Sequence, residues 1–249
     1  MWRIVGRSWR IAAGNLGVVC VVALVQLCLG LAALALPGQD EVWTAGQQLL
    51  GVVLGLVNFF FLPFVQGGYL AVANAKASQR TEPSALTEFW QGARQWYGRL
   101  LGFEALTVVL VLALVVGSGL LLVLALLPAQ RAMTLSVVLT LAASVPIGIG
   151  LYVFLLIVTM TPIAIVVENL KVFQGLARGL RIGRRMVGQL VLMNLACLLT
   201  VLPGLMLVGI FGLLGWPLVT VLLQSFLSAV LMLVFLLAYV QLYQSQGTS

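Results

Sequence analysis

The sequence predicts an all-α integral membrane protein, a polytopic bundle of six transmembrane helices. Of its 249 residues, 62% are hydrophobic and only 8% are charged, whereas charged residues make up roughly a quarter of an ordinary soluble domain. Several apolar stretches also exceed the roughly 20 residues that a helix needs to cross a hydrocarbon core of about 30 Å. Because removing these stretches leaves no soluble domain, residues 1–249 are expected to form a single membrane domain.

Six apolar stretches are predicted to cross the membrane. They are Leu16–Leu36, Leu49–Ala73, Leu100–Leu127, Thr134–Val167, Leu190–Leu213 and Leu218–Tyr243. The fourth stretch is longer than a bilayer requires and contains Pro146 and Pro162. A proline inside a helix removes a backbone hydrogen bond, so this helix is expected to tilt, to bend near Pro146, or to continue past the bilayer.

Six spans place the connecting segments alternately on the two sides of the membrane, and nearly all basic residues fall on one side. Twelve of the thirteen Lys and Arg residues precede the first span or lie between spans two and three or between spans four and five. Only Arg131 falls on the opposite side, together with Asp40 and Glu41. Since cytoplasmic loops carry the excess of Lys and Arg, both termini are predicted to lie in the cytoplasm and the chain in the cell membrane.

A short pattern recurs before the first, third and fifth spans. It consists of Arg, three further residues, Gly, a polar residue and Leu, and it starts at Arg10, Arg94 and Arg184, which are 84 and 90 residues apart. The pattern predicts three helical hairpins, at about residues 1–75, 76–167 and 168–249, and parallel repeats of this kind occur in transporter folds. Chance or the shared physics of the membrane interface could also produce so short a pattern.

A basic segment introduces each hairpin and is predicted to form an amphipathic helix at the cytoplasmic interface. In the second segment Ser84 is the expected N-cap. The third segment is the most basic, with Arg178, Arg181, Arg184 and Arg185. Anchoring alone explains these arginines; the sharper hypothesis is that they bind an anionic headgroup, at roughly 1 kcal/mol each. Membrane lipids are therefore expected partners, and nucleic acid is not, since no binding module surrounds the basic segments.

Two carboxylates are expected near the cytoplasmic ends of the spans. Glu104 lies about one turn inside the third span, and Glu168 ends the fourth. The sequence predicts that both join a cluster of ion pairs with Arg99 and with Arg184 or Arg185. Structural clamping is the expected role of this cluster, because buried carboxylates need partners.

Neutral polar side chains, rather than charged ones, occupy the middle of the spans. Asn58, Gln66, Asn194 and Gln224 are expected to line a cavity if the hairpins enclose one, and otherwise to form hydrogen bonds between helices. The chain has no histidine, which removes a common ligand of haem and metal ions and the usual base of nucleophilic catalysis. No catalytic residue, metal site or cofactor is predicted, and the chain is not expected to be an enzyme.

The most distinctive stretch begins at Pro162. Pro162 and a run of aliphatic residues lead into Glu168, Asn169 and Leu170, and a basic amphipathic helix follows. This resembles the glycerophosphoryl diester phosphodiesterase membrane-domain family and related six-span prokaryotic proteins of unknown function, although Arg and Gly stand where that helix commonly has Ser-Trp. The resemblance implies an inner-membrane module with Glu168 and Asn169 as signature positions. It does not imply phosphodiesterase activity, because in that family a separate soluble barrel is the catalytic domain.

Two functions remain open from the sequence. The leading hypothesis is a non-enzymatic scaffold or accessory subunit of a membrane assembly, with other membrane-protein subunits as partners. The alternative is a transporter or lipid-handling protein with a cavity between its hairpins. A tightly packed bundle with apolar outer faces favours the first function, whereas a cavity lined by the polar residues of the spans favours the second.

Overall fold

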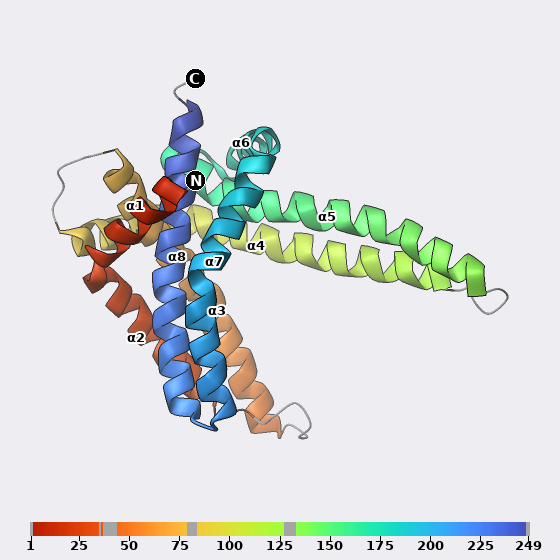
Figure 1. Cartoon of the computed structure of the whole chain (residues 1–249), viewed down its shortest axis with the longest axis horizontal. Coiled ribbons are helices and arrows are strands. Elements are labelled where there is room, and N and C mark those ends of the chain that lie inside the picture. The colour runs from red at the N-terminus through yellow and green to blue at the C-terminus, as the bar shows by residue number, and fades with distance from the viewer. Residues whose placement is uncertain (1, 35, 37–43, 79–83, 127–132, 248–249) are drawn as a thin grey trace. The chain divides into compact units, whose positions relative to one another are not determined.

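The computed structural model describes residues 2–34, 36, 44–78, 84–126 and 133–247. In these residues all regular structure is helical (Figure 1). The helices are α1 (Trp2–Ala13), α2 (Leu16–Ala33), α3 (Ala45–Ala77), α4 (Ala85–Leu126), α5 (Met133–Val167), α6 (Val172–Arg185), α7 (Val187–Leu213) and α8 (Pro217–Gly247).

Six of these helices are long and apolar enough to cross a membrane, which confirms the predicted spans. They are α2, α3, α4, α5, α7 and α8, and their span segments contain 18 to 36 residues. The chain is therefore a polytopic α-helical membrane protein. The fourth span is one helix, α5, that continues through both Pro146 and Pro162.

The predicted layout needs a correction at α4. The sequence predicts a separate interfacial helix before the third span, whereas residues Ala85–Leu126 form a single helix of 42 residues. No proline interrupts this stretch, and isolated glycines such as Gly92 and Gly98 cost a helix only about 1 kcal/mol each. The predicted N-cap is confirmed, because the Ser84 hydroxyl oxygen accepts a hydrogen bond from the Thr87 N–H at 3.4 Å.

The contacts of the chain divide it into two compact units. Unit 1 contains residues 1–100 and 186–249, and unit 2 contains residues 101–185. Unit 1 thus holds α1, α2, α3, the first part of α4, α7 and α8; unit 2 holds the rest of α4, α5 and α6. The single domain and the repeat boundaries at about 75 and 167 stay predictions.

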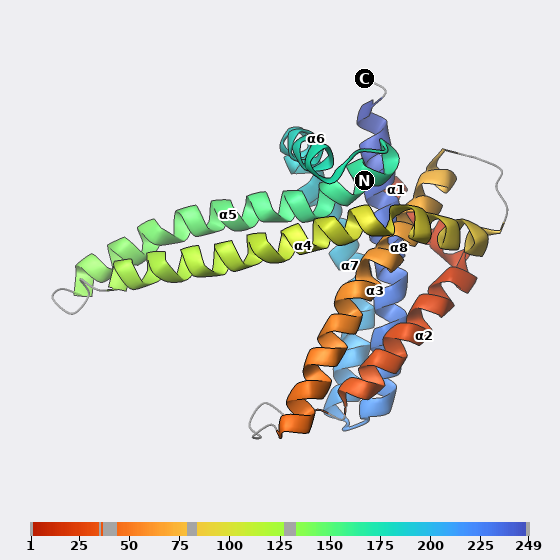
Figure 2. The same cartoon turned by 180° about the vertical axis from the view of Figure 1, so that it is seen from behind.

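Helix α8 forms the centre of unit 1. It contacts α1, α2, α3 and α7, and Figures 1 and 2 show it running beside them. Leu233 and Leu237 are fully buried, and so is Tyr69 of α3. The Tyr69 hydroxyl donates a hydrogen bond to the carbonyl oxygen of Ala229 at 3.2 Å, so one of the few polar groups in this core is satisfied by backbone.

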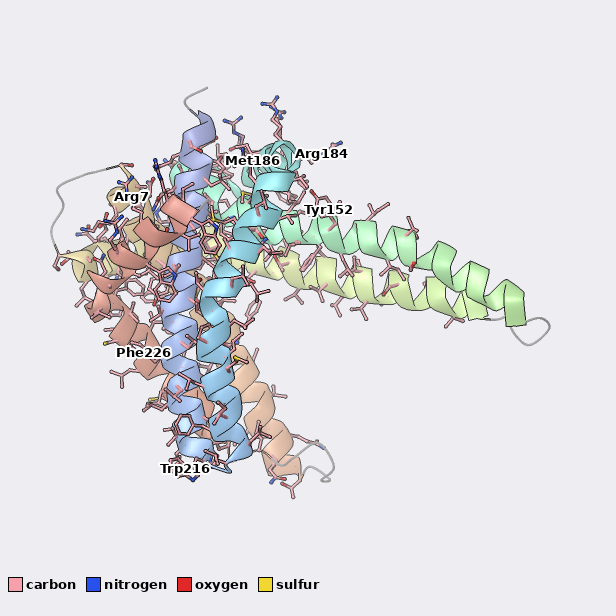
Figure 3. The ribbon with its side chains drawn as sticks, viewed as in Figure 1. Arg7, Tyr152, Arg184, Met186, Trp216 and Phe226 are labelled. Atoms are coloured by element: carbon pink, nitrogen blue, oxygen red, sulfur yellow. The ribbon has the colours of Figure 1, made fainter. Side chains whose placement is uncertain are left out.

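Helix α1 and the last turns of α3 and α8 meet at one end of unit 1. The Gln241 side-chain amide donates to the Ser8 hydroxyl oxygen at 3.4 Å, and that of Gln244 donates to the Asn74 side-chain oxygen at 2.9 Å. Helix α1 buries Val5, Ser8 and Ala12 and exposes Arg3, Arg7 and Arg10 (Figure 3 labels Arg7). Basic residues of unit 1 therefore gather at this end. Arg80, Arg131, Asp40 and Glu41, which also enter the predicted orientation, lie outside the described residues.

The first part of α4 crosses α3 at close range. A Cβ atom added to Gly67 would lie 3.2 Å from Leu100 Cδ1, and one added to Gly92 would overlap Ala71. Glycine at these two positions allows the helices to approach closely, as small residues do in membrane helix pairs.

At the opposite end of α8, a tight turn connects it to α7. Gly215 adopts a positive φ of 69°, and the Trp216 N–H donates to the Phe211 carbonyl at 3.2 Å, a Schellman-type helix end. Pro217 then starts α8, where its missing N–H costs nothing. Trp216, which Figure 3 labels, stacks on Phe211 at this turn, and tryptophan is enriched at membrane interfaces.

In unit 2, α4 and α5 run side by side (Figures 1 and 2). A Cβ atom added to Gly150 of α5 would lie 3.0 Å from Leu114 Cδ1 of α4. Helix α6 packs against α5, and this pair contains the most distinctive stretch of the sequence.

Candidate functional site

A four-residue turn joins α5 to α6. Asn169 adopts a left-handed conformation with φ 56°, and the Leu170 N–H donates to the Ile165 carbonyl at 3.1 Å. Asparagine tolerates this conformation better than most residues do, and the hydrogen bond closes the end of α5 in the Schellman manner. On the other side of the turn, the Gln174 side-chain oxygen accepts a hydrogen bond from the Lys171 N–H at 3.3 Å. Asn169 therefore ends α5, while Gln174 caps the start of α6.

Three glycines spaced four residues apart form the face of α6 that packs on α5. Gly175, Gly179 and Gly183 are all buried. A Cβ atom at Gly175 would lie 2.5 Å from Ile165 Cγ1, and one at Gly179 would lie 2.9 Å from the backbone nitrogen of Thr161. A larger residue would thus force the two helices apart, which explains why this basic helix contains glycine. The four-residue spacing was the sequence signal for this face, which the predictions from sequence did not include.

Arg178 and Glu168 link α6 to the end of α5. The Arg178 Nε lies 3.0 Å from each of the two carboxylate oxygens of Glu168, and both side chains are partly exposed, at 39% and 29%. Of the four arginines predicted to bind a headgroup, Arg178 is therefore engaged within the protein. Arg181, Arg184 and Arg185 are exposed on α6 (Figure 3 labels Arg184).

The structure does not test the predicted ion-pair cluster as a whole. Glu168 pairs with Arg178, which was not among the predicted members. The Arg99 guanidinium lies 5.2 Å from the centre of the Trp96 ring, and Arg99 belongs to unit 1, whereas Glu104 is half-buried in unit 2. Arg185 is exposed at the end of α6. The four-residue cluster stays a prediction.

A pocket of about 430 Å³, called the polar pocket below, lies between α2, α3 and α8 in unit 1. Much of its lining is apolar, from residues such as Leu29, Ala33 and Val221. Its polar lining residues are Gln26, Asn58, Gln224, Ser225 and Ser228. The Ser228 hydroxyl donates to the Gln26 side-chain oxygen at 2.5 Å, which joins α8 to α2. Asn58 and Gln224 are exposed to the pocket region, so their carboxamides can donate and accept hydrogen bonds there.

The pocket extends along the helix axes from the ends of the spans toward their middle. It reaches from Leu34, at the end of α2, to Gln26, which is about 12 Å at 1.5 Å per residue. On α8 it reaches from Val221, near the start of the helix, to Ser228. These helix ends are opposite to the end of unit 1 where Ser8 and Gln241 meet.

Two of the four residues predicted to line a cavity lie in this pocket, and two lie elsewhere. Asn58 and Gln224 line it. Asn194 instead accepts a hydrogen bond from the Tyr239 hydroxyl, between α7 and α8. Gln66 is half-buried in α3, and its side-chain oxygen has no hydrogen-bond partner among the described residues. Gln26 also lines the pocket but was not among the four predicted residues. The sequence shows that it is a polar residue within a span, but its position opposite Ser228 depends on how the helices pack.

The chain was compared with protein-family models, curated proteins and solved structures, and none of the three comparisons finds a match.

Proposed function

We propose that this chain is a non-enzymatic integral membrane protein that serves as a scaffold or accessory subunit of a membrane assembly and contacts anionic lipid through α6. The observation that carries the lipid contact is the division of α6 into two faces. Its glycines pack on α5, while Arg181, Arg184 and Arg185 are exposed. An amphipathic helix held in this way directs arginines toward headgroups, and three arginines contribute roughly 3 kcal/mol of attraction to an anionic leaflet.

The proposed arrangement has both termini in the cytoplasm and three hairpins, α2–α3, α4–α5 and α7–α8. Helices α1 and α6 and the first part of α4 then lie at the cytoplasmic interface of an inner membrane, as the family resemblance implies. The gathering of α1, the end of α3 and the end of α8 supports this orientation, because it places Arg3, Arg7, Arg10 and Lys76 at the same end of unit 1.

The proposed role in an assembly rests on the apolar outer faces of the spans and not on tight packing, because the described residues leave much of several spans uncovered. Of the 18-residue window of each span, 11% is buried in α3 and in α4 and 17% in α2 and in α7, against 33% in α8 and 50% in α5. Lipid or partner helices must cover the remaining apolar surface. Purification in mild detergent followed by mass spectrometry should recover a stoichiometric membrane-protein subunit. A preparation that contains this chain alone, even after crosslinking in the native membrane, would contradict the role in an assembly.

The lipid contact is tested by native mass spectrometry of the purified protein in mixed phosphatidylglycerol and phosphatidylcholine. Replacing Arg181, Arg184 and Arg185 by Gln should lower the preference for phosphatidylglycerol, by about fivefold for each arginine. The matched control replaces the same three residues by Lys, which keeps the charge and should keep most of the preference. An unchanged preference in the glutamine variant would contradict the proposed contact.

A second function, transport or lipid handling, is favoured by the polar pocket between α2, α3 and α8. The carboxamide and hydroxyl groups of this pocket lie within the spans, where they suit a polar ligand or water better than hydrocarbon. Labelling of a Gln224→Cys variant by a water-soluble thiol reagent tests this function, with Leu222→Cys as the control. Leu222 is also exposed on α8 but does not line the pocket.

A further inference from the structure

An apolar groove of about 480 Å³ lies between α3 and the first part of α4. Its α3 side runs from Val53 to Phe64, and its α4 side is Tyr97. Val53, Val57 and Phe60 are all exposed, so the described part of the chain does not cover the groove. All of these residues belong to unit 1, and none is in the polar pocket or on α6.

The groove has the depth of one bilayer leaflet. From Ala45, the first residue of α3, to Phe64 the helix rises about 28 Å, close to the roughly 30 Å of a hydrocarbon core. Gly67, one turn beyond Phe64, lies against Leu100 at the start of the predicted third span. Phe64 therefore lies near the cytoplasmic boundary of the core when Ala45 lies near the other, although the predicted second span continues to Ala73. From Phe64 to Val53 the groove extends about 16 Å, which is roughly half of the core and matches the space of one acyl chain.

Aromatic and basic side chains mark the boundary end of the groove. The Phe64 ring lies 5.1 Å from the Trp90 ring and 6.3 Å from the Tyr97 ring, between centroids. Arg94 is four residues after Trp90 and three before Tyr97, so it shares their helix face, and its guanidinium lies 6.0 Å from the centre of the Trp90 ring. Tryptophan and tyrosine are the residues enriched at membrane interfaces. A cation thus stands at the interfacial end of a groove that is otherwise apolar.

We propose that this groove holds an acyl chain of an anionic phospholipid whose phosphate pairs with Arg94. An amphiphile with one charged end matches a groove with one cationic end, and arginine pairs well with phosphate. A transmembrane partner helix could also cover α3, because its exposed apolar face continues past the groove to Leu49. An apolar helix offers no charge to Arg94, however, whereas an anionic headgroup does. The site does not include the arginines of α6, so an experiment can contradict one proposed lipid contact and leave the other standing.

The test uses the full chain in nanodiscs with a phospholipid that carries a photoactivatable diazirine in its acyl chain. Phosphatidylglycerol and phosphatidylcholine with the same labelled chain are compared, and crosslinked peptides are mapped by mass spectrometry. We expect crosslinks at residues 53–64 to favour phosphatidylglycerol. Arg94→Gln should reduce that preference about fivefold, and Val57→Trp, which fills the groove, should reduce the crosslinks with both lipids.

Two variants serve as controls. Val191→Trp places the same bulk on an exposed apolar position of α7 and should leave the crosslinks at residues 53–64 unchanged. The glutamine variant of Arg181, Arg184 and Arg185 should also leave them unchanged. Size-exclusion elution and the unfolding temperature identify any variant that has lost its fold, and the single substitution Arg94→Gln tests the charge if Val57→Trp misfolds.

Three results would overturn the proposal. Equal crosslinking by the two lipids, unaffected by Arg94→Gln, would mean that ordinary annular lipid occupies the groove. Crosslinks that survive Val57→Trp at full yield would place the acyl chain elsewhere. Loss of the preference in the α6 variant but not in Arg94→Gln would assign the phosphate contact to α6.

Discussion

Arg178 of α6 and Glu168 at the end of α5 form an ion pair in which the arginine Nε lies 3.0 Å from both carboxylate oxygens. The pair bridges the turn through Asn169, next to the glycine face that packs on α5. Helix α6 is thus held by a capped turn, an ion pair and close backbone packing. This arrangement determines where its remaining arginines project.

Removing one partner of this ion pair should loosen α6 modestly. Both side chains are partly exposed, and exposed pairs contribute about 0.2–1 kcal/mol. Glu168→Gln is expected to lower the unfolding free energy in detergent by an amount in this range. A double-mutant cycle with Arg178→Gln measures the coupling, and additive losses from the two substitutions would show that the pair contributes nothing.

Adding one methyl group to the glycine face of α6 should lower the stability of the protein, whereas adding one at a glycine with open space around it should not. Gly179→Ala would place a Cβ atom 2.9 Å from the Thr161 backbone nitrogen, and overpacking of this kind typically costs about 1–3 kcal/mol. Gly188→Ala is the control, because Gly188 of α7 has open space around it and alanine favours a helix by about 0.5–1 kcal/mol. Thermal unfolding in detergent should show a loss for Gly179→Ala and none for Gly188→Ala. Equal effects would mean that α6 does not depend on this close contact.

A third prediction concerns Asn169, the residue in the left-handed conformation between α5 and α6. Asn169 has φ 56°, a conformation that costs most other residues of order 1–3 kcal/mol. Asn169→Val should therefore destabilise the protein by about that amount, whereas Asn169→Gly, which accepts a positive φ, should destabilise it less. The unfolding midpoints of the two variants, measured side by side, check this order. A valine variant as stable as the glycine variant would rule out the described turn.

Water access to the polar pocket gives a fourth prediction. In a background where Cys20, Cys28 and Cys197 are replaced, Gln224→Cys is expected to react with a small water-soluble thiol reagent faster than Leu222→Cys. The pocket gives residue 224 polar neighbours, whereas position 222 is exposed and does not line the pocket. A polar reagent is expected to reach an apolar surface inside the bilayer slowly. Labelling rates in membranes provide the measurement. Equal rates would remove the support that the pocket gives to transport or lipid handling.

The sequence was sufficient for the features that depend on local chemistry. The length of each apolar stretch predicted the six spans, since crossing a bilayer sets a minimum length, and the hydroxyl of Ser84 predicted where α4 begins. The predicted break between the second basic segment and the third span is absent, because amphipathic character does not by itself end a helix when no proline or capping residue intervenes.

The features that the sequence could not supply depend on packing between helices. Gln26 lies opposite Ser228, about two hundred positions away in the chain, because α2 packs on α8. Asn194 and Gln66 are as polar as Asn58, but their helix faces place them away from the polar pocket. The partner of Glu168 was likewise decided by geometry, since Arg178 projects back across the turn while other arginines of α6 project outward.

The orientation of the helices underlies the proposed lipid contacts and is tested most directly by single cysteines at positions that the proposed orientation places on opposite sides of the membrane. In the cysteine-free background, Arg184→Cys marks α6 and Leu213→Cys marks the α7–α8 turn, where Leu213 is 90% exposed. An impermeant thiol reagent should label Leu213→Cys in intact cells and Arg184→Cys only in inside-out vesicles. Labelling of both positions from the same side, or with the sides exchanged, would contradict the cytoplasmic position of the basic helices.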